Sequence, residues 1–223
     1  MRSSGRTILA AFISTTALAA ASFAGTPKPT PTSVYAQSIR NLTDQVQPYA
    51  AVALTNYSWQ EGGETRTIDS TVPIKFEFNR GGNLFGRWDG TSVIIYPVAF
   101  WFEFSGGNAT VGDISAALFM TLIHEYLHQR WSSPMDLCHE LRTHLATAEV
   151  ACGLICDAPT ALEEYVAGNI AALCKFLGNR VYEMNLFRLG SQSCSGIPET
   201  HAIKFCCGCC TPPVESNNGC DEE

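Results

Sequence analysis

The chain has 223 residues, a length that suits a single domain, and 46% of its residues are hydrophobic. Acidic residues outnumber basic ones by 21 to 14, which gives a formal net charge of −7 at pH 7. An excess of negative charge argues against nucleic acid or an anionic membrane as the main partner. The composition therefore disfavours two broad classes of function and leaves the others open.

Residues 1–24 have the organisation of a secretory signal peptide. A basic start with Arg2 and Arg6 precedes an apolar stretch at 8–20, and residues 22–24 have the small-x-small pattern of a cleavage site. The apolar stretch is too short for a membrane span. We expect an exported protein, extracellular or periplasmic, whose remaining 12 basic and 21 acidic residues give a net charge of −9.

Residues 25–45 begin with Gly-Thr-Pro-Lys-Pro-Thr-Pro-Thr-Ser, a run rich in proline and threonine. Such a composition favours an extended and poorly ordered chain. We therefore expect a linker or a short propeptide over residues 25–45. One domain over residues 46–190 should follow it, and a cysteine-rich tail should occupy residues 191–223.

Strand signals dominate residues 50–104. Apolar and charged residues alternate in 72–78, which is the period of a half-buried strand. The dipeptide Asp89-Gly90 between two apolar runs predicts a hairpin. The apolar run 100–104 predicts a further strand. This half of the chain should form a mostly antiparallel sheet.

Residues 113–131 predict a buried helix that is apolar on most sides, with Asp113 as its N-cap. Residues 124–128 of this helix read His-Glu-Tyr-Leu-His, an H-E-x-x-H motif. Four residues of helix turn through about 400°, so the two imidazoles share one face and can bind one divalent ion. Glu125 lies about 100° around the helix. There its carboxylate can take a proton from water and pass it to a leaving group. The alternative is a chance match with structural histidines.

Two further helices are expected after the motif. The first begins at residues 133–134, where a serine cap precedes a proline. The second opens with a capping box at 160–163 and ends at the Gly-Asn pair 178–179. The sheet, the buried helix and these helices together predict an α+β fold.

A hydrolytic zinc site needs a third protein ligand besides His124 and His128. The candidates are the histidines and acids on the following helices: His139, His144, Glu149, Asp157, Glu163 and Glu164. On a straight helix His139 and His144 differ by about 140° and cannot share one ion.

Glu149 follows His128 by 21 residues and lies on the next predicted helix. With this glutamate the chain resembles the zincin metallopeptidases, and among them the glutamate-ligand branch, the gluzincins. The resemblance covers the motif helix and the helix after it. It implies a zincin-like domain over residues 46–190 and one Zn²⁺ ion bound by His124, His128 and Glu149. Gluzincins also use a Tyr or His donor to stabilise an oxyanion. The candidates here are Tyr165, Tyr182 and His201.

All ten cysteines follow residue 137, four on the predicted helices and six in the tail. In an oxidising compartment an even number of cysteines favours disulfides. The run Cys-Cys-Gly-Cys-Cys at 206–210 places its sulfurs too close together for comfortable pairing within the run. We expect the tail to be bridged back to the helices, which would also fix the helix that carries Glu149. A metal or redox cluster at 206–210 is the alternative.

These features predict a secreted, monomeric zinc metallopeptidase that acts on protein or peptide substrates. Glu125 would be the catalytic base. Endopeptidase action is favoured because nothing in the sequence suggests a pocket for a free chain terminus. An extended substrate could pair with the edge of a strand from residues 92–104. The alternative is a secreted, disulfide-rich binding or toxin-like protein whose H-E-x-x-H is not catalytic.

Overall fold

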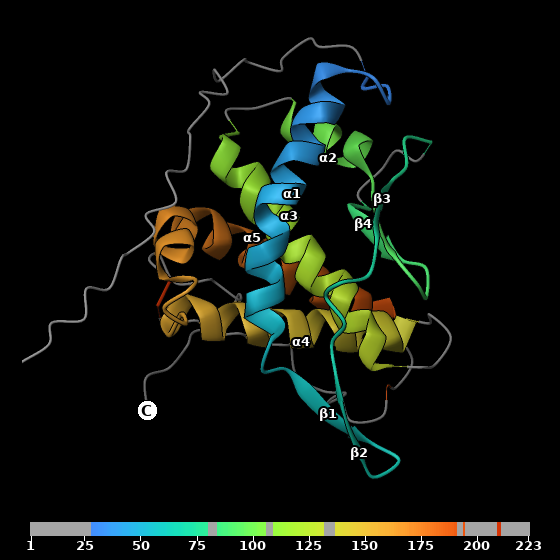
Figure 1. Ribbon diagram of the computed structural model, residues 1–223, viewed down its shortest axis with the longest axis vertical. Helices are drawn as coiled ribbons and strands as arrows, with labels where there is room; N and C mark the ends of the chain where they lie inside the picture. The colour runs from blue at the N-terminus through green and yellow to red at the C-terminus, as the bar shows by residue number, and fades with distance from the viewer. Residues whose placement is uncertain are drawn as a thin grey trace, which may run out of the picture.

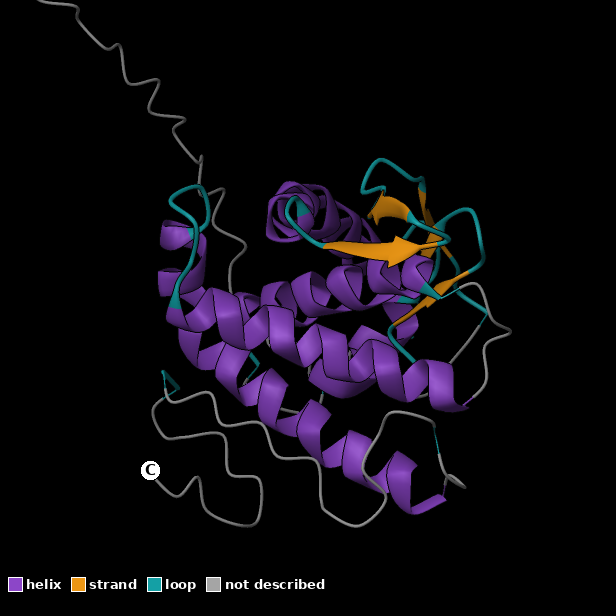
Figure 2. Ribbon diagram, turned by 90° about the horizontal axis from the view of Figure 1, so that it is seen from below, coloured by secondary structure: helices purple, strands orange, loops and turns teal. Residues whose placement is uncertain are grey.

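The computed structural model describes residues 28–79, 84–105, 109–131, 137–190, 194 and 209–210. Within these ranges the fold is α+β, as predicted: five α-helices form the body of the molecule (Figure 1). The strands gather at one side of that body (Figure 2). The predicted signal peptide and most of the tail lie outside these ranges. In the part of the chain that they cover, no helix combines the length and apolar character of a membrane span.

Helix α1, Val34–Leu54, begins within the segment that was expected to be a linker, residues 25–45. The side chain of Ser33 caps it by accepting a hydrogen bond of 3.2 Å from the Ala36 backbone N–H. One apolar face recurs every three or four residues and is buried against α3: Ile39, Leu42, Val46, Ala50 and Leu54. The proline-rich run therefore ends before Val34, and the rest of the segment expected to be a linker is helical.

The first of two small sheets is an exposed antiparallel hairpin of β1, Ser58–Glu61, and β2, Glu64–Thr67. Its turn places Gly62 and Gly63 at φ values of 61° and 85°, which are accessible to glycine without strain. The hairpin projects from the helical body in Figure 1.

The second sheet contains three strands in the order β3-β5-β4. β3, Ile74–Phe76, is parallel to β5, Val93–Ile95, and β4, Gly86–Trp88, is antiparallel to β5. The turn that contains Asp89 and Gly90 joins β4 to β5, so the predicted hairpin is confirmed. The expectation of a mostly antiparallel sheet holds for two of the three strand pairs in the described chain.

Helix α2, Pro97–Phe104, occupies the apolar run that was predicted to be a strand, and that prediction was wrong. Pro97 starts the helix, where its fixed φ and missing N–H are tolerated. Phe100 is fully buried and contacts Phe85, with ring centroids 4.7 Å apart. Periodicity cannot separate a short buried helix from a buried strand in a continuous apolar run.

The substrate was expected to pair with the edge of a strand from residues 92–104. The one strand in that range, β5, lies between β3 and β4 and therefore has no open edge. The strand that borders α3 at the edge of the sheet is β4.

Helix α3, Val111–Leu127, runs through the centre of the molecule and carries the first four residues of the H-E-x-x-H motif (Figure 1). Thr110 is its N-cap and forms a reciprocal capping box with Asp113, which is therefore at the third helical position rather than at the cap. Most residues from Ile114 onward are buried because α1, α4 and α5 pack around this helix. The predicted buried helix is confirmed, and a 3-10 turn, His128–Arg130, continues it.

Helix α4, Leu137–Cys156, and helix α5, Glu163–Gly190, confirm the two helices expected after the motif. The cap predicted at 133–134 lies outside the described residues. Helix α5 begins within the predicted capping box but continues past the Gly-Asn pair at 178–179. A glycine in a helix costs only about 1 kcal/mol, which other contacts can offset.

Among the described residues, three disulfides connect the helices to the tail, as predicted: Cys138–Cys194, Cys156–Cys209 and Cys174–Cys210. Cys156 ends α4 and Cys174 lies within α5. Because their partners are adjacent in sequence, the two bonds fasten α4 to α5.

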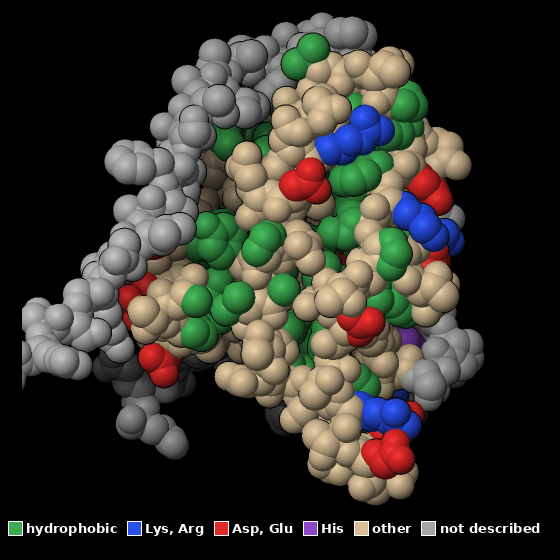
Figure 3. Space-filling view, in the orientation of Figure 1, with side chains coloured by type: hydrophobic (Ala, Val, Ile, Leu, Met, Phe, Trp, Pro, Cys, Tyr) green, Lys and Arg blue, Asp and Glu red, His purple; other side chains and the backbone are tan. Residues whose placement is uncertain are grey.

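The face drawn in Figure 3 carries few charged side chains, and on its described part basic and acidic groups lie near one another. Ion pairs of this kind join Lys75 Nζ to Asp89 Oδ2 at 3.3 Å and Arg66 to Glu64 at 2.9 Å. Such exposed pairs contribute little to stability.

Replacing both Cys138 and Cys194 with serine should lower the free energy of unfolding by about 2–4 kcal/mol, because the bond constrains a long loop of the unfolded chain. Its two cysteines are 56 residues apart. Equilibrium denaturation under non-reducing conditions measures the effect, and an unchanged midpoint would contradict it. Non-reducing peptide mapping of the unaltered protein provides the control, since it should recover all three bonds.

Candidate metal site

The two histidines of the motif meet at their Nε2 atoms. His124 lies in the last turn of α3, and His128 opens the 3-10 turn that follows. Their Nε2 atoms are 3.1 Å apart, and the rings stand at 90° to each other. The motif therefore presents two potential ligand atoms to one point, as its spacing predicted.

Glu140 on α4 completes this group. One of its carboxylate oxygens, Oε1, lies 3.0 Å from His124 Nε2, and the other, Oε2, lies 3.5 Å from His128 Nε2. Ligand atoms around a tetrahedral zinc ion lie about 3.3–3.6 Å apart, given zinc–ligand bonds of about 2.0–2.2 Å. The spacing thus fits a metal of this size, and His124, His128 and Glu140 could hold one ion. We call these three residues the ligand group.

Glu149, the glutamate implied by the resemblance to gluzincins, does not lie in the ligand group. It is exposed on α4, nine residues after Glu140. Nine residues of helix turn through about 900°, so the two side chains point in opposite directions. Glu140 instead shares a face with His144 and Thr147, which follow it by four and seven residues. That spacing, opposite a helix with H-E-x-x-H, is the signal that could have identified Glu140.

The other nitrogen of each imidazole has a polar partner on α4. Thr147 Oγ1 lies 3.2 Å from His124 Nδ1 and donates its proton to the Thr143 carbonyl at 2.7 Å. Thr147 can therefore only accept from His124, which places the proton on Nδ1. His128 Nδ1 lies 2.8 Å from His139 Nε2 and 3.2 Å from Thr143 Oγ1. A metal that replaced the Nε2 protons would leave these Nδ1 partners in place, so each ring would keep the orientation that directs its Nε2 atom at the ligand group.

The protonation states favour metal binding as well. Burial, and then the positive potential of His124, lowers the pKa of His128 to about 2, so this imidazole is neutral near pH 7. Burial raises the pKa of Glu140, but hydrogen bonds with His124 and His144 outweigh it and hold the pKa below its ordinary value. A neutral imidazole and an ionised carboxylate are the forms that bind a metal.

Glu125 lies beside the ligand group, where the sequence placed it. Its Oε2 is 3.8 Å from His128 Nε2, and the residue is only 4% exposed. Gly86 of β4 approaches this carboxylate so closely that a Cβ there would lie 3.0 Å from Glu125 Oε1 and 2.8 Å from Thr121 Cγ2. Because position 86 of β4 carries no side chain, the Glu125 carboxylate has room to lie beside this strand.

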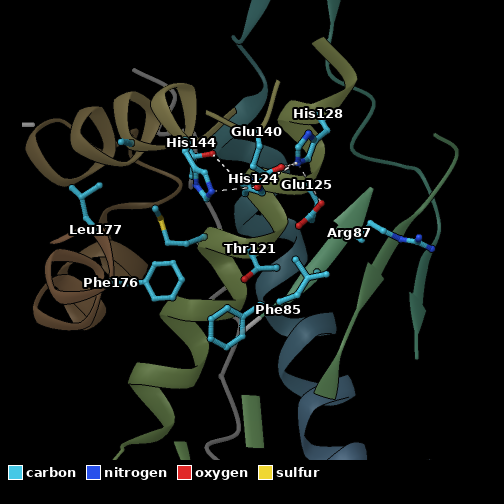
Figure 4. A pocket seen from close by; sticks show the side chains of 15 residues that line it. Phe85, Arg87, Thr121, His124, Glu125, His128, Glu140, His144, Phe176 and Leu177 are labelled. Atoms are coloured by element: carbon cyan, nitrogen blue, oxygen red, sulfur yellow. Dashed lines mark hydrogen bonds and ion pairs between the residues drawn. The ribbon is translucent and has the colours of Figure 1, made fainter. Parts of the chain in front are cut away.

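The ligand group and Glu125 line a cavity of about 300 Å³. His144 also lines it, and its Nε2 lies 3.2 Å from Glu140 Oε1. The ring centroids of His144 and His124 are 4.4 Å apart. A third imidazole thus adjoins the ligand group at the cavity wall, as Figure 4 shows.

The remaining candidates occupy other positions. His139 contacts His128 from behind and is 3% exposed, so it supports a ligand rather than acting as one. Tyr165 packs against Tyr49 and Phe119. Three acids are exposed: Asp157, Glu163 and Glu164. The side chains of Tyr182 and His201 lie outside the described residues.

No protein-family model, curated protein or solved structure matches the chain. The geometry of the ligand group and its cavity is therefore the feature of the chain that points to a function.

Glu140→Ala should weaken zinc binding at least tenfold, because it removes the only carboxylate of the ligand group. Glu149→Ala is the matched control, the same substitution on the other face of the same helix, and should bind zinc like the unaltered protein. Competition with a chromogenic chelator measures both affinities. Equal affinities, or a loss with the Glu149 variant alone, would contradict this assignment.

Proposed function

We propose that this protein is a secreted zinc-dependent peptidase in which His124, His128 and Glu140 bind the metal. The observation that carries the proposal is the convergence of three ligand atoms at one end of a cavity, with the Glu125 carboxylate beside them. The three disulfides support export, because such bonds persist in oxidising compartments. The basic start and apolar stretch of residues 1–24, which have the pattern of a secretory signal peptide, also support export.

The ligand group fits a hydrolytic zinc site in the number and kind of its residues. Two imidazoles and one carboxylate are the number and kind of protein ligands that would hold a catalytic zinc ion. When bound there, Zn²⁺ supplies a Lewis acid that polarises a carbonyl and makes water more acidic. The Glu140 carboxylate offsets one of the two positive charges, and the Nδ1 partners of the histidines fix their orientation.

Glu125 acts as the general base and then as the general acid. Its carboxylate, almost excluded from solvent, accepts a proton from the attacking water and transfers it to the departing amine nitrogen. Amide hydrolysis needs this second transfer, since an unprotonated amine is a poor leaving group. A carboxylate beside the ligand group can serve both steps because it lies within reach of the same point.

His144 is suited to stabilise the oxyanion that forms when water attacks a carbonyl. It lines the cavity beside the ligand group, and the role requires its Nε2–H, which lies 3.2 Å from Glu140 Oε1, to turn from that carboxylate to the oxyanion. An N–H directed at developing negative charge in a water-poor site contributes strongly to catalysis. This histidine takes the role for which the sequence offered Tyr165, Tyr182 and His201.

A metal-free, disulfide-rich binding protein is the second candidate. One observation favours it: His124 and His144 both lie within hydrogen-bond distance of Glu140, so protonated imidazoles could satisfy the carboxylate without an ion. This role needs no base at Glu125. Metal content and the effect of changing Glu125 therefore separate the two functions.

Glu125→Gln should retain zinc and lose about 10²–10⁴-fold in the rate of peptide hydrolysis, because the amide cannot accept a proton. The measurement combines zinc content with the cleavage of an unfolded protein substrate such as reduced casein. Glu149→Gln is the control and should keep both properties. Native protein that binds no zinc, or full activity in the Glu125 variant, would contradict the proposed function.

Gly86→Ala should lower the hydrolytic rate at least tenfold with zinc still bound, because the new Cβ meets Glu125 Oε1 and Thr121 Cγ2. Steady-state kinetics and zinc content measure the two effects. Gly153→Ala is the control: this glycine is exposed on α4, and an added Cβ would have nothing within 4 Å. Equal activity of the Gly86 and Gly153 variants would contradict the prediction, because it would show that the close approach of β4 does not position Glu125.

A further inference from the structure

The cavity continues beyond the ligand group into an apolar end, which we call the apolar chamber. Its walls come from the segment before β4 and from α3, α4 and α5: Leu84, Phe85, Met120, Ala148, Phe176 and Leu177. We propose that the apolar chamber receives a large uncharged side chain of the substrate, next to the peptide bond that is cleaved. This inference depends on the proposed function and names the substrate class of that site.

The chemistry of the cavity is divided between its ends. At one end of the cavity are the ligand group itself and two further ionisable side chains, Glu125 and His144. Phe85, Phe176 and Leu177 lie apart from them in Figure 4, toward α5. Arg87 also lines the cavity, but its side chain points away from the ligand group toward the opposite side of the picture. A charged group in the apolar chamber would therefore lose its hydration without gaining a partner there.

The size of the cavity limits what can enter. Its volume of about 300 Å³ must hold both the attacked bond and the group in the apolar chamber. Sites for drug-sized ligands occupy about 300–1,000 Å³, so this one lies at the small end of that range. A single side chain, aromatic or branched aliphatic, fits the space better than a long lipid chain or a folded domain.

The chamber is held in shape before any ligand binds. Leu177 is fully buried, and Cys174, one helical turn before it on α5, is bonded to Cys210. The neighbouring Cys209 is bonded to the end of α4. Phe85 and Phe176, which both line the cavity, pack against each other with ring centroids 6.2 Å apart. A wall fixed in this way selects by shape, because little conformational freedom is lost on binding.

Two hydroxamates that differ only in an apolar arm test the inference by direct binding. Acetohydroxamate reaches the ligand group alone, whereas 3-phenylpropanohydroxamate adds a ring for the apolar chamber. Calorimetry on the zinc-loaded full protein should show at least tenfold tighter binding of the phenyl compound, because burying an aromatic ring is strongly favourable. Equal affinities would overturn the inference and leave the metal site intact. Failure of both compounds to bind would overturn the proposed function and this inference with it.

Phe176→Ala should remove most of the phenyl preference without weakening acetohydroxamate. Phe102→Ala is the matched control, since Phe102 is 54% exposed on α2 and does not line the cavity. Leu84→Ala is a second chamber variant at a residue that is 43% exposed, so it spares the core if the Phe176 variant fails to fold. Cleavage of a peptide library should agree, with phenylalanine or leucine beside the cleaved bond preferred at least tenfold over aspartate. A phenyl preference that survives both chamber variants would also overturn the inference.

Discussion

The packing of α4 against the end of α3 is the interaction on which the proposed chemistry depends. Helix α4 turns one polar face toward the motif, and its members recur at helical spacing: Glu140, Thr143, His144 and Thr147. Through this face α4 supplies the third potential ligand and the partners that orient both imidazoles. If α4 were rotated by half a turn, Glu149 would face the motif instead and the Nδ1 partners would be lost.

A cluster of polar groups inside an apolar core is expensive unless its members satisfy one another. The threonines of α4 donate to carbonyls of their own helix, and this leaves only acceptor oxygens for the imidazoles. As a consequence, two Nε2 atoms and a carboxylate converge within 3.0–3.5 Å. Like partial charges at that distance repel, so the arrangement favours a cation between them, whether a metal or a proton. The same burial lowers the pKa of His128 and keeps this imidazole neutral near pH 7.

The disulfides explain how a modest set of helices can hold this geometry. Helices α4 and α5 lie toward the C-terminal end of the described chain. One disulfide joins Cys138, two residues before Glu140 on α4, to Cys194 of the tail. Two more bonds fasten the end of α4 to α5, which forms a wall of the apolar chamber. Covalent bonds of this kind narrow the range of α4–α5 arrangements and so stabilise both the ligand group and the cavity next to it.

The sequence by itself determined the local features. The spacing of His124 and His128, the place of Glu125 beside them, the turn at Asp89-Gly90 and the bridging of the tail all follow from short-range geometry or from the redox chemistry of cysteine. It misassigned residues 100–104, because a short apolar run fits a buried helix as well as a strand. Only the tertiary structure decided that Glu140 rather than Glu149 joins the histidines and that β4 borders the site. Those outcomes depend on the rotation of one helix against another and on the order of strands in a sheet. Side chains distant in sequence determine both through packing, and the spacing of Glu140, His144 and Thr147 marks a polar face of α4 without showing which way that face turns.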